Sequence, residues 1–281
     1  MNEQRINAVA DALAAIGYDG ITAFDRTEPE YDTLTYLYDR YDSEAHVKLL
    51  GLLAASQDYQ LNGDGQQFWQ ALEDTATNFE HLNSTQAVRD LLGEFVEADV
   101  NARLNEQKRD RLVRVLQAGF DEWFVANHAS VTPLEVWERF ADDMQTRMES
   151  KTVVLAMKIY DIAHLIRHDT YLEFPREIPI PCDLQVERVS TSAGITDSTD
   201  TDTVLDAWAA VMEVTSDQLG RHVSLLRIDS IIWQAGQIIG KHEPDQQAAQ
   251  EALQQHFQTV GLDSEPATNL AQELTLLLES A

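Results

Sequence analysis

The sequence KTVVLAMKIYDIAHLI at residues 151–166 predicts a long helix with apolar side chains on most of its faces. A helix of this kind packs inside a protein, so we expect it at the centre of the fold. Ser150 stands directly before it and is a residue type that caps helix N-termini. Lys151 and Lys158 are seven positions apart and therefore lie on one face of this helix.

Helical periodicity continues on both sides of this segment through nearly the whole chain. Apolar residues recur at spacings of three and four in residues 4–17, 33–57, 66–80, 84–98, 108–127, 133–148, 184–194, 202–215, 222–240, 246–259 and 267–279. No long stretch alternates with a period of two, which is the pattern of a half-buried strand. The sequence therefore predicts an all-α fold.

Capping residues and helix breakers mark several boundaries. Thr132-Pro133-Leu134-Glu135 has the pattern of a capping box, and Asp183 can cap a helix that begins at Leu184. Residues 174–182 hold three of the seven prolines, which predicts a stiff, extended connector. The segment after Pro244 predicts two further helices. We therefore expect a main helical domain over residues 1–242 and a C-terminal helical extension over residues 243–281.

The chain is strongly acidic. Its 20 Lys and Arg against 48 Asp and Glu give a net charge of −28, while 44% hydrophobic residues exclude a disordered acidic protein. Only five of the basic residues are Lys, a bias that suggests a cytoplasm of molar salt, as in a haloarchaeon. At about 1 M salt the screening length falls to about 3 Å, which removes most of the self-repulsion. In such a protein an acidic composition does not exclude a nucleic-acid partner.

Several classes of protein are disfavoured by what the chain lacks. Cys182 is the single cysteine, so the sequence has no disulfide framework and no Cys-based zinc site. No apolar run approaches the roughly 18 residues of a membrane span, and the first residues do not resemble a secretory signal. We expect a soluble, cytoplasmic protein without membrane contact.

Lys151 is the first candidate for chemistry. The positive end of the helix dipole favours the neutral, nucleophilic form of an amine, and such an amine can form a Schiff base with a carbonyl-type carbon. Alternatively, Lys151 and Lys158 extend from a core helix to solvent. Asp183 ends the stiff connector, where its carboxylate could face a developing positive charge, could cap the next helix, or could do both.

Two tryptophan positions and one histidine pair each allow a functional or a structural interpretation. Asp229 and Trp233 are four apart on one helical face, an arrangement that can hold a flat, hydrogen-bonding ligand such as a base. A Trp in such a helix is more commonly part of the core. Trp69, after the turn at residues 63–65, also has the pattern of a core residue. His164 and His168 are four apart, as metal ligands can be, but no third ligand has a recognisable spacing. A histidine near a helix C-terminus, where the helix dipole favours it, is the better interpretation.

One stretch is basic, although the chain as a whole is acidic. Residues 103–114 carry a local net charge of +3, from Arg103, Lys108, Arg109, Arg111 and Arg114 against Glu106 and Asp110. This basic island could contact phosphates. Equally, it could be a helix face with intrahelical ion pairs such as that of Glu106 with Arg109.

Taken together, three blocks of sequence resemble the archaeal 8-oxoguanine DNA glycosylase/lyases, a divergent branch of the helix-hairpin-helix DNA glycosylases. The blocks are ESKTVV at residues 149–154 with Lys158, IPIPCD at residues 178–183, and Asp229 with Trp233. Weaker similarity runs from residues 28–31 through residues 61–65 and Trp69 to the basic island. The resemblance covers about residues 5–242.

The resemblance implies a role for each matching position. Lys151 corresponds to the nucleophile that attacks C1′, expels the base and forms a Schiff base before the strand is cleaved. Asp183 corresponds to the carboxylate that assists this step. Trp69 and Trp233 match aromatic residues around the extruded base, Asp229 matches a polar contact to the base, and Lys158 is a second basic residue near the site. The implied chemistry needs no metal and no organic cofactor.

Three departures from the family pattern bear on base recognition and DNA binding. Glu30 stands where the family has a Gln that reads the base, and an ionised carboxylate lacks the donor of an amide. Leu155 replaces an aromatic residue four positions after Lys151. The hairpin at residues 144–150 has no glycine. The candidates for DNA-backbone contacts are Lys108, Arg109, Arg111 and Arg147.

These observations combine into one expectation. We expect an all-α protein of two packed helical subdomains with a central cleft, in which Lys151 and Asp183 line the same cleft. It would act as a monomeric 8-oxoguanine DNA glycosylase and AP lyase in base excision repair, on double- or single-stranded DNA that contains 8-oxoguanine or abasic sites. The alternatives are a non-catalytic helical DNA-binding or interaction protein with this fold, and a lyase with altered base specificity.

Overall fold

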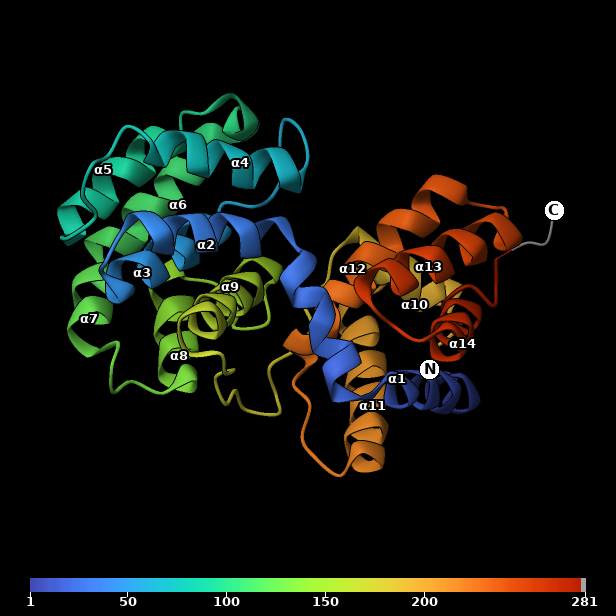
Figure 1. Cartoon of the computed structure of the whole chain (residues 1–281). Helices are drawn as coiled ribbons and strands as arrows, with labels where there is room; N and C mark the ends of the chain where they lie inside the picture. Colours follow the sequence, from blue (N-terminus) through green and yellow to red (C-terminus); the bar gives the residue numbers. More distant parts are fainter. Residues whose placement is uncertain (279–281) are drawn as a thin grey trace. The chain divides into compact units, whose positions relative to one another are not determined.

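A computed structural model describes residues 1–278, and secondary structure within this range is helical throughout, with no strand. The prediction of an all-α fold is therefore confirmed. The described helices fall into two compact units (Figure 1). Unit 1 combines Met1–Thr27 with the chain from Arg176 onward, and unit 2 is Glu28–Pro175.

Unit 2 is built around the helix that residues 151–166 predict. Its elements are α2 (Pro29–Arg40), α3 (Glu44–Ala55), α4 (Gly65–Ala76), α5 (Thr85–Phe95), the 3-10 turn η2 (Asp99–Asn101), α6 (Asn105–Gln117), α7 (Phe120–Asn127), α8 (Pro133–Met144) and α9 (Lys151–His168). Helix α9 buries 12 of its 18 residues and packs against α2, α3 and α8. Its apolar faces thus form the centre of unit 2, as expected.

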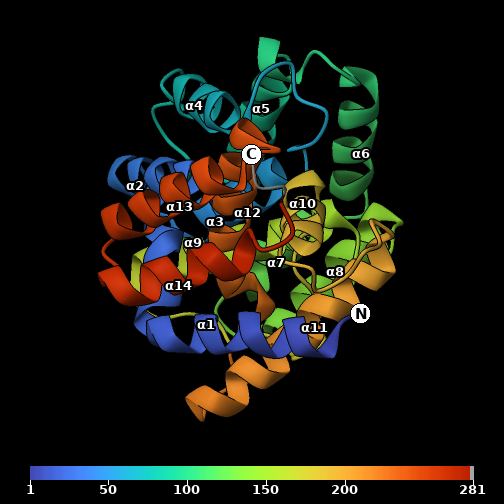
Figure 2. The same ribbon diagram turned by 90° about the vertical axis from the view of Figure 1, so that its right-hand side faces the viewer.

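Unit 1 is formed by the two ends of the chain. Its elements are α1 (Glu3–Ala23), the 3-10 turn η1 (Phe24–Thr27), α10 (Leu184–Ser192), α11 (Thr201–Leu219), α12 (Leu225–His242), α13 (Gln246–Val260) and α14 (Ser264–Leu274). Helix α1 packs against α11, α12 and α14, and α10 packs against α12. Figure 2 shows α1 and α14 side by side.

The C-terminal helices contribute to the core of unit 1. Leu253 and Phe257 of α13, together with Leu270 and Leu274 of α14, are fully buried in the same cluster as residues of α1 and α12. The boundaries between the two units fall after Thr27 and after Pro175 rather than at residue 242. Residues 243–278 are therefore packed into unit 1, and a domain boundary at residue 242 stays a prediction.

Most of the predicted helix boundaries are present. The capping box at Thr132 forms, with the Glu135 amide donating to Thr132 Oγ1 at 3.3 Å and the Thr132 amide donating to Glu135 Oε2 at 2.8 Å. Ser150 occupies the N-cap position of α9, but its side chain makes no capping hydrogen bond and instead lies 2.9 Å from Thr146 Oγ1. The periodic stretch 108–127 is divided at Gly119, which has a φ of 77°.

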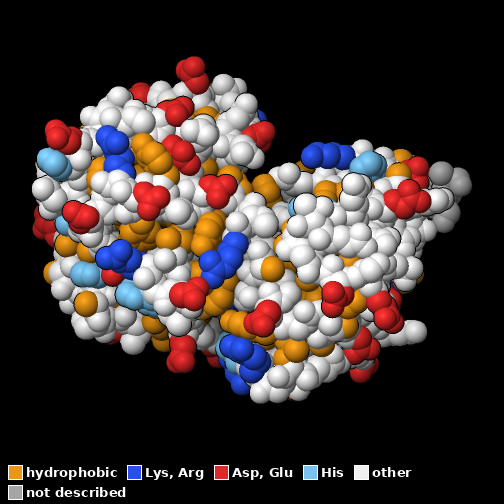
Figure 3. Space-filling view, viewed as in Figure 1, with side chains coloured by type: hydrophobic (Ala, Val, Ile, Leu, Met, Phe, Trp, Pro, Cys, Tyr) orange, Lys and Arg blue, Asp and Glu red, His pale blue; other side chains and the backbone are white. Residues whose placement is uncertain are grey.

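The sequence led us to expect no membrane span and an acidic surface. Among the described residues, no helix combines the length and hydropathy needed to cross a bilayer. On the face drawn in Figure 3, acidic side chains are scattered rather than gathered in one patch.

Candidate active site

Lys151 is the first residue of α9, and its half-buried side chain follows a hairpin that side chains hold in place. Trp137 Nε1 donates to the Met148 carbonyl at 2.8 Å, and Arg114 Nη1 donates to the Met144 carbonyl at 3.1 Å. Gln145 takes a left-handed conformation, with a φ of 54°. These contacts hold the hairpin at residues 144–150, which contains no glycine.

The same face of α9 carries Leu155 and Lys158 one and two turns beyond Lys151. Leu155 is 9% exposed and Lys158 is 2% exposed. Lys158 Nζ lies 3.4 Å from Glu30 Oε1 of α2, so these two buried charges compensate each other. Burial raises the pKa of Glu30, and the Lys158 ammonium opposes that rise.

Trp69 belongs to the core of unit 2. It is 2% exposed, and its ring meets Phe68 edge-on at 5.3 Å between centroids. Its carbonyl accepts a hydrogen bond from Thr33 Oγ1 at 3.3 Å, which ties α4 to α2. Since Glu30 also belongs to α2, this helix links Trp69 to the face of α9 that carries Lys158.

The other predicted site residues lie in unit 1. The Asp183 carboxylate caps α10, because Oδ1 accepts from the amides of Gln185 at 2.8 Å and Val186 at 3.2 Å. Asp229 of α12 is 4% exposed, whereas Trp233 one turn later is half-buried. Trp233 is therefore not a fully buried core residue, in contrast to Trp69.

The predicted site residues are thus divided between the units. Unit 2 holds Lys151 with Glu30, Trp69, Leu155 and Lys158, and unit 1 holds Asp183, Asp229 and Trp233. That Lys151 and Asp183 line one cleft stays a prediction.

The candidates for DNA-backbone contacts separate into different environments. Lys108 is fully buried, and its Nζ donates to Asn101 Oδ1 at 2.9 Å, so the prediction that Lys108 contacts phosphate at the surface is wrong.

The three arginine candidates differ in exposure. The half-buried Arg111 lies over the Tyr59 ring at 4.5 Å. Arg109 is exposed and paired with Glu97, and Arg147 is exposed 3.5 Å from Glu149. Arg109 and Arg147 therefore remain surface candidates.

A buried ion pair in unit 1 has no signal in the sequence. Arg227 Nη1 donates to Asp25 Oδ2 at 2.6 Å, and Ser230 Oγ donates to Asp25 Oδ1 at 2.7 Å. Asp25 is fully buried and Arg227 is 2% exposed. The pair fixes η1 against α12, the helix that carries Asp229 and Trp233. Its members are 202 positions apart, so no local pattern could have revealed it.

A histidine pair gains a third partner from the fold. Glu44 of α3 joins His164 and His168, and one potential metal-ligand atom from each lies within 4.8 Å of the others. However, Lys48 Nζ contacts Glu44 Oε1 at 2.5 Å and His164 Nδ1 at 3.1 Å. Burial and the nearby ammonium lower the pKa of His164 to about 4, which keeps its ring a neutral acceptor. An ammonium group therefore already supplies the positive charge at this cluster, and the expectation that the protein needs no metal stays a prediction.

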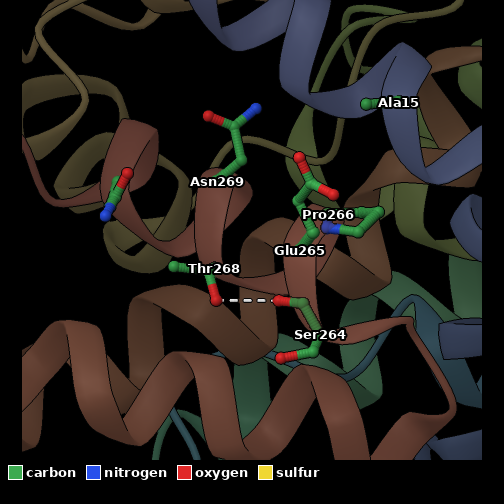
Figure 4. A pocket seen from close by; sticks show the side chains of 7 residues that line it. Ala15, Ser264, Glu265, Pro266, Thr268 and Asn269 are labelled. Atoms are coloured by element: carbon green, nitrogen blue, oxygen red, sulfur yellow. Dashed lines mark hydrogen bonds between the residues drawn. The ribbon is translucent and has the colours of Figure 1, made fainter.

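A surface pocket is lined by none of the predicted site residues. Figure 4 shows it at the start of α14, where Ser264, Glu265, Pro266, Thr268 and Asn269 line it together with Ala15 and Gln272. The dashed line in the figure is the bond from Thr268 Oγ1 to the Ser264 carbonyl, at 2.7 Å. This bond is an ordinary interaction within one helix, and the pocket contains no cluster of reactive groups.

Comparison with known proteins shows the family to which this all-helical chain belongs. Residues 10–270 match the family model described as AGOG: N-glycosylase/DNA lyase. The chain belongs to this family of N-glycosylase/DNA lyases, and it is an enzyme that acts on DNA. This assignment sets aside the alternative of a non-catalytic DNA-binding or interaction protein.

Curated relatives agree with this assignment. The N-glycosylase/DNA lyase of Pyrobaculum aerophilum is 24% identical over 239 residues, which are 84% of this chain and 88% of that protein. The enzyme of the same name from Thermococcus kodakarensis is 23% identical, with coverage of 83% and 84%. A crystal structure of the 8-oxoguanine DNA glycosylase from Pyrobaculum aerophilum, complexed with 8-oxoguanosine, has the same fold, with a TM-score of 0.71, 20% identity and 97% coverage of both chains.

Proposed function

We propose that this protein excises 8-oxoguanine from DNA in base excision repair and then cleaves the strand through a Schiff base on Lys151. The observation that carries the proposal is the position of Lys151, at the first turn of a buried central helix and directly after a hairpin clamped by Trp137 and Arg114. A nucleophile needs such a rigid setting because attack depends on close alignment of the reacting atoms. The solved relative, an 8-oxoguanine DNA glycosylase, supports the choice of base.

The proposed reaction begins with attack of the neutral Lys151 amine on C1′ of the damaged nucleotide. The bond from C1′ to the base breaks, and the base leaves with the electron pair and takes up a proton. The nitrogen bound to C1′ then loses one proton. The C1′–O4′ bond breaks and O4′ takes up a proton, which opens the sugar ring and gives an iminium between Nζ and C1′. Removal of a proton from C2′ then expels the 3′ phosphate and breaks the strand. The Asp183 carboxylate would stabilise the positive charge that develops on the sugar.

Borohydride trapping tests the role of Lys151, because borohydride reduces an iminium to a stable amine. We expect wild-type protein to give a covalent adduct with an 8-oxoguanine duplex in molar KCl. Lys151→Gln should abolish the adduct, since an amide cannot form an iminium. Lys241→Gln, which changes an exposed lysine at the end of α12, is the matched control and should retain it.

Two results would overturn this assignment. An adduct that survives in Lys151→Gln would move the nucleophile to another amine. The absence of any adduct from folded wild-type protein would contradict the Schiff-base mechanism itself. Trapping in the presence of EDTA tests the further expectation that no metal is needed.

Glu30 is the proposed determinant of base recognition. An ionised carboxylate accepts hydrogen bonds and does not donate them. 8-Oxoguanine has an N–H at N7, where guanine has a lone pair, so a carboxylate paired with Lys158 would favour the oxidised base. Burial of Glu30 beside Lys158 supports this interpretation, because water does not compete strongly for a buried acceptor.

Substitution at Glu30 separates base recognition from strand cleavage. We expect Glu30→Ala to reduce excision of 8-oxoguanine by about 10- to 100-fold, as the loss of about 1–3 kcal/mol of hydrogen bonding implies. Cleavage of a duplex with a preformed abasic site, which has no base to recognise, should be nearly unchanged. Glu30→Gln retains an acceptor and should lose less activity. Equal loss on both substrates would contradict the proposed role, and wild-type activity on abasic sites alone would favour altered base specificity.

A further inference from the structure

Arg111 connects three separate segments of unit 2 through one guanidinium group. Its Nη1 lies 3.2 Å from Thr152 Oγ1 and 3.5 Å from the Ser56 carbonyl. Its Cζ lies 4.5 Å from the centre of the Tyr59 ring. Stacking on an aromatic ring holds the planar group in a fixed orientation, which a flexible ammonium would not keep.

The residue that Arg111 binds in α9 is the immediate neighbour of Lys151. Thr152 is the second residue of the helix, so a bond to its Oγ1 restrains the turn from which the Lys151 side chain extends. The usual restraint on this turn is missing, because the Ser150 side chain makes no capping hydrogen bond. The Arg111 guanidinium therefore restrains the first turn of α9 from outside the helix, whereas the side chain of the N-cap residue makes no capping hydrogen bond.

Helix α6 holds both ends of the hairpin. Arg114, one turn after Arg111, donates to the Met144 carbonyl at the start of the hairpin, and Arg111 binds Thr152 just after its end. Residues three apart lie on the same face of a helix, so one face of α6 spans the whole hairpin. This arrangement uses two of the five basic residues of the island for internal contacts, and burial of Lys108 removes a third from the surface.

We infer that Arg111 is a positioning residue for Lys151, which acts through Thr152 and not through contact with a DNA phosphate. The inference rests on the proposed function, since it requires Lys151 to be the nucleophile. A reacting group has to be held within about 0.5 Å of its productive position, and a displacement of about 1 Å can cost about 100-fold in rate. Loss of the tie should therefore slow the chemistry more than it weakens DNA binding.

A pair of conservative substitutions isolates the hydrogen bond. Thr152→Val keeps the shape of the side chain but removes the acceptor, whereas Thr152→Ser keeps the acceptor. Arg111→Met removes the donor from the other side. Arg40→Met is the matched control, because Arg40 also lies over a tyrosine ring, that of Tyr41 at 5.6 Å, and donates to the backbone carbonyls of Thr77 and Phe79.

The measurements are the single-turnover rate of borohydride trapping on an abasic duplex, the dissociation constant for the same DNA, and the melting temperature. We expect Thr152→Val and Arg111→Met each to reduce the trapping rate by about 10- to 100-fold with the dissociation constant within about threefold of wild type. The double variant should be no slower than Arg111→Met alone, since both changes remove the same bond. Thr152→Ser and Arg40→Met should trap at nearly the wild-type rate.

Two outcomes would overturn the inference while leaving the proposed function intact. If Arg111→Met weakens DNA binding in a salt-dependent way at an unchanged trapping rate, Arg111 is a phosphate contact. If Thr152→Val traps as fast as Thr152→Ser, the hydrogen bond does not position Lys151. Failure of the proposed function itself has a different signature, because wild-type protein would then form no adduct.

Discussion

Lys108 is buried, although it belongs to a charged segment whose other basic side chains reach the surface or are only half-buried. It belongs to a strongly basic stretch, yet its side chain is fully buried and donates to Asn101. Burial lowers the pKa of Lys108 from its usual value of 10.5 to about 8, because the charged form loses its hydration. The lysine is therefore part of the interior of unit 2, and its charge costs stability near neutral pH.

This shift predicts an unusual pH dependence of stability. Below about pH 8 the amine is protonated in both the folded and the unfolded state, and the folded state bears the full desolvation cost. Between about pH 8 and 10.5 the unfolded state binds more protons than the folded state, so stability rises with pH. Relative to Lys108→Met, wild-type protein should gain about 1–3 kcal/mol of unfolding free energy across that window.

Urea unfolding at constant KCl measures this difference. Lys241→Met, which changes an exposed lysine, is the control and should track wild-type protein across the same pH range. A difference between wild type and Lys108→Met that stays constant from pH 8 to 10.5 would show that burial does not perturb this amine.

At the scale of elements, the approach of α10 to α12 depends on one glycine. A Cβ on Gly236 of α12 would lie 2.7 Å from the Gln185 carbonyl oxygen and 2.7 Å from the Gln185 Cβ. Asp183 caps α10, and Asp229 and Trp233 belong to α12, so this close contact sets the spacing of the two helices that carry the predicted site residues of unit 1. Any larger residue at position 236 has to push the two helices apart.

The same substitution at two glycines should therefore have opposite effects. Gly236→Ala should destabilise the protein by about 1–3 kcal/mol, because the added methyl group meets backbone atoms that cannot rotate away. Gly93→Ala, on the exposed side of α5 with nothing within 4 Å of the new Cβ, should be neutral or stabilise by up to about 1 kcal/mol. Thermal unfolding of both variants measures the contrast, and equal effects would mean that α10 and α12 adjust freely.

At the scale of the whole molecule, the net charge of −28 governs the response to salt. Excess negative charge repels DNA and destabilises the compact state at low ionic strength, and salt screens both effects. Two of the five basic residues of the basic island are unavailable to counteract this repulsion, since Lys108 is buried and Arg111 lies against Tyr59. The release of few counterions on DNA binding is therefore our expectation.

We therefore expect DNA affinity to depend weakly on salt. A protein with 6–10 phosphate contacts loses about 10³- to 10⁵-fold in affinity between 50 and 200 mM salt, whereas this enzyme should lose less than about tenfold. Fluorescence anisotropy with an abasic duplex, extended to molar KCl, measures the slope. Sucrose, which does not screen charge, is the control. A steep loss of affinity would contradict the expected adaptation to high salt.

Local patterns in the sequence determined much of the secondary structure. The apolar helix α9, the capping box at Thr132 and the cap at Asp183 depend on residues within four positions of one another, so they can be predicted without knowledge of the fold. The order of the blocks around Lys151, Asp183 and Trp233 also indicated the enzyme family that the relatives support.

Only the tertiary structure decided which charges are buried and what compensates them. It paired Glu30 with Lys158 and Asp25 with Arg227, brought Glu44 beside the two histidines, and placed Lys108 in the interior. It also revealed the tie from Arg111 to Thr152 across 41 positions. The physical reason is that helix formation is governed by neighbours along the chain, whereas burial and ion pairing depend on segments that folding alone brings together.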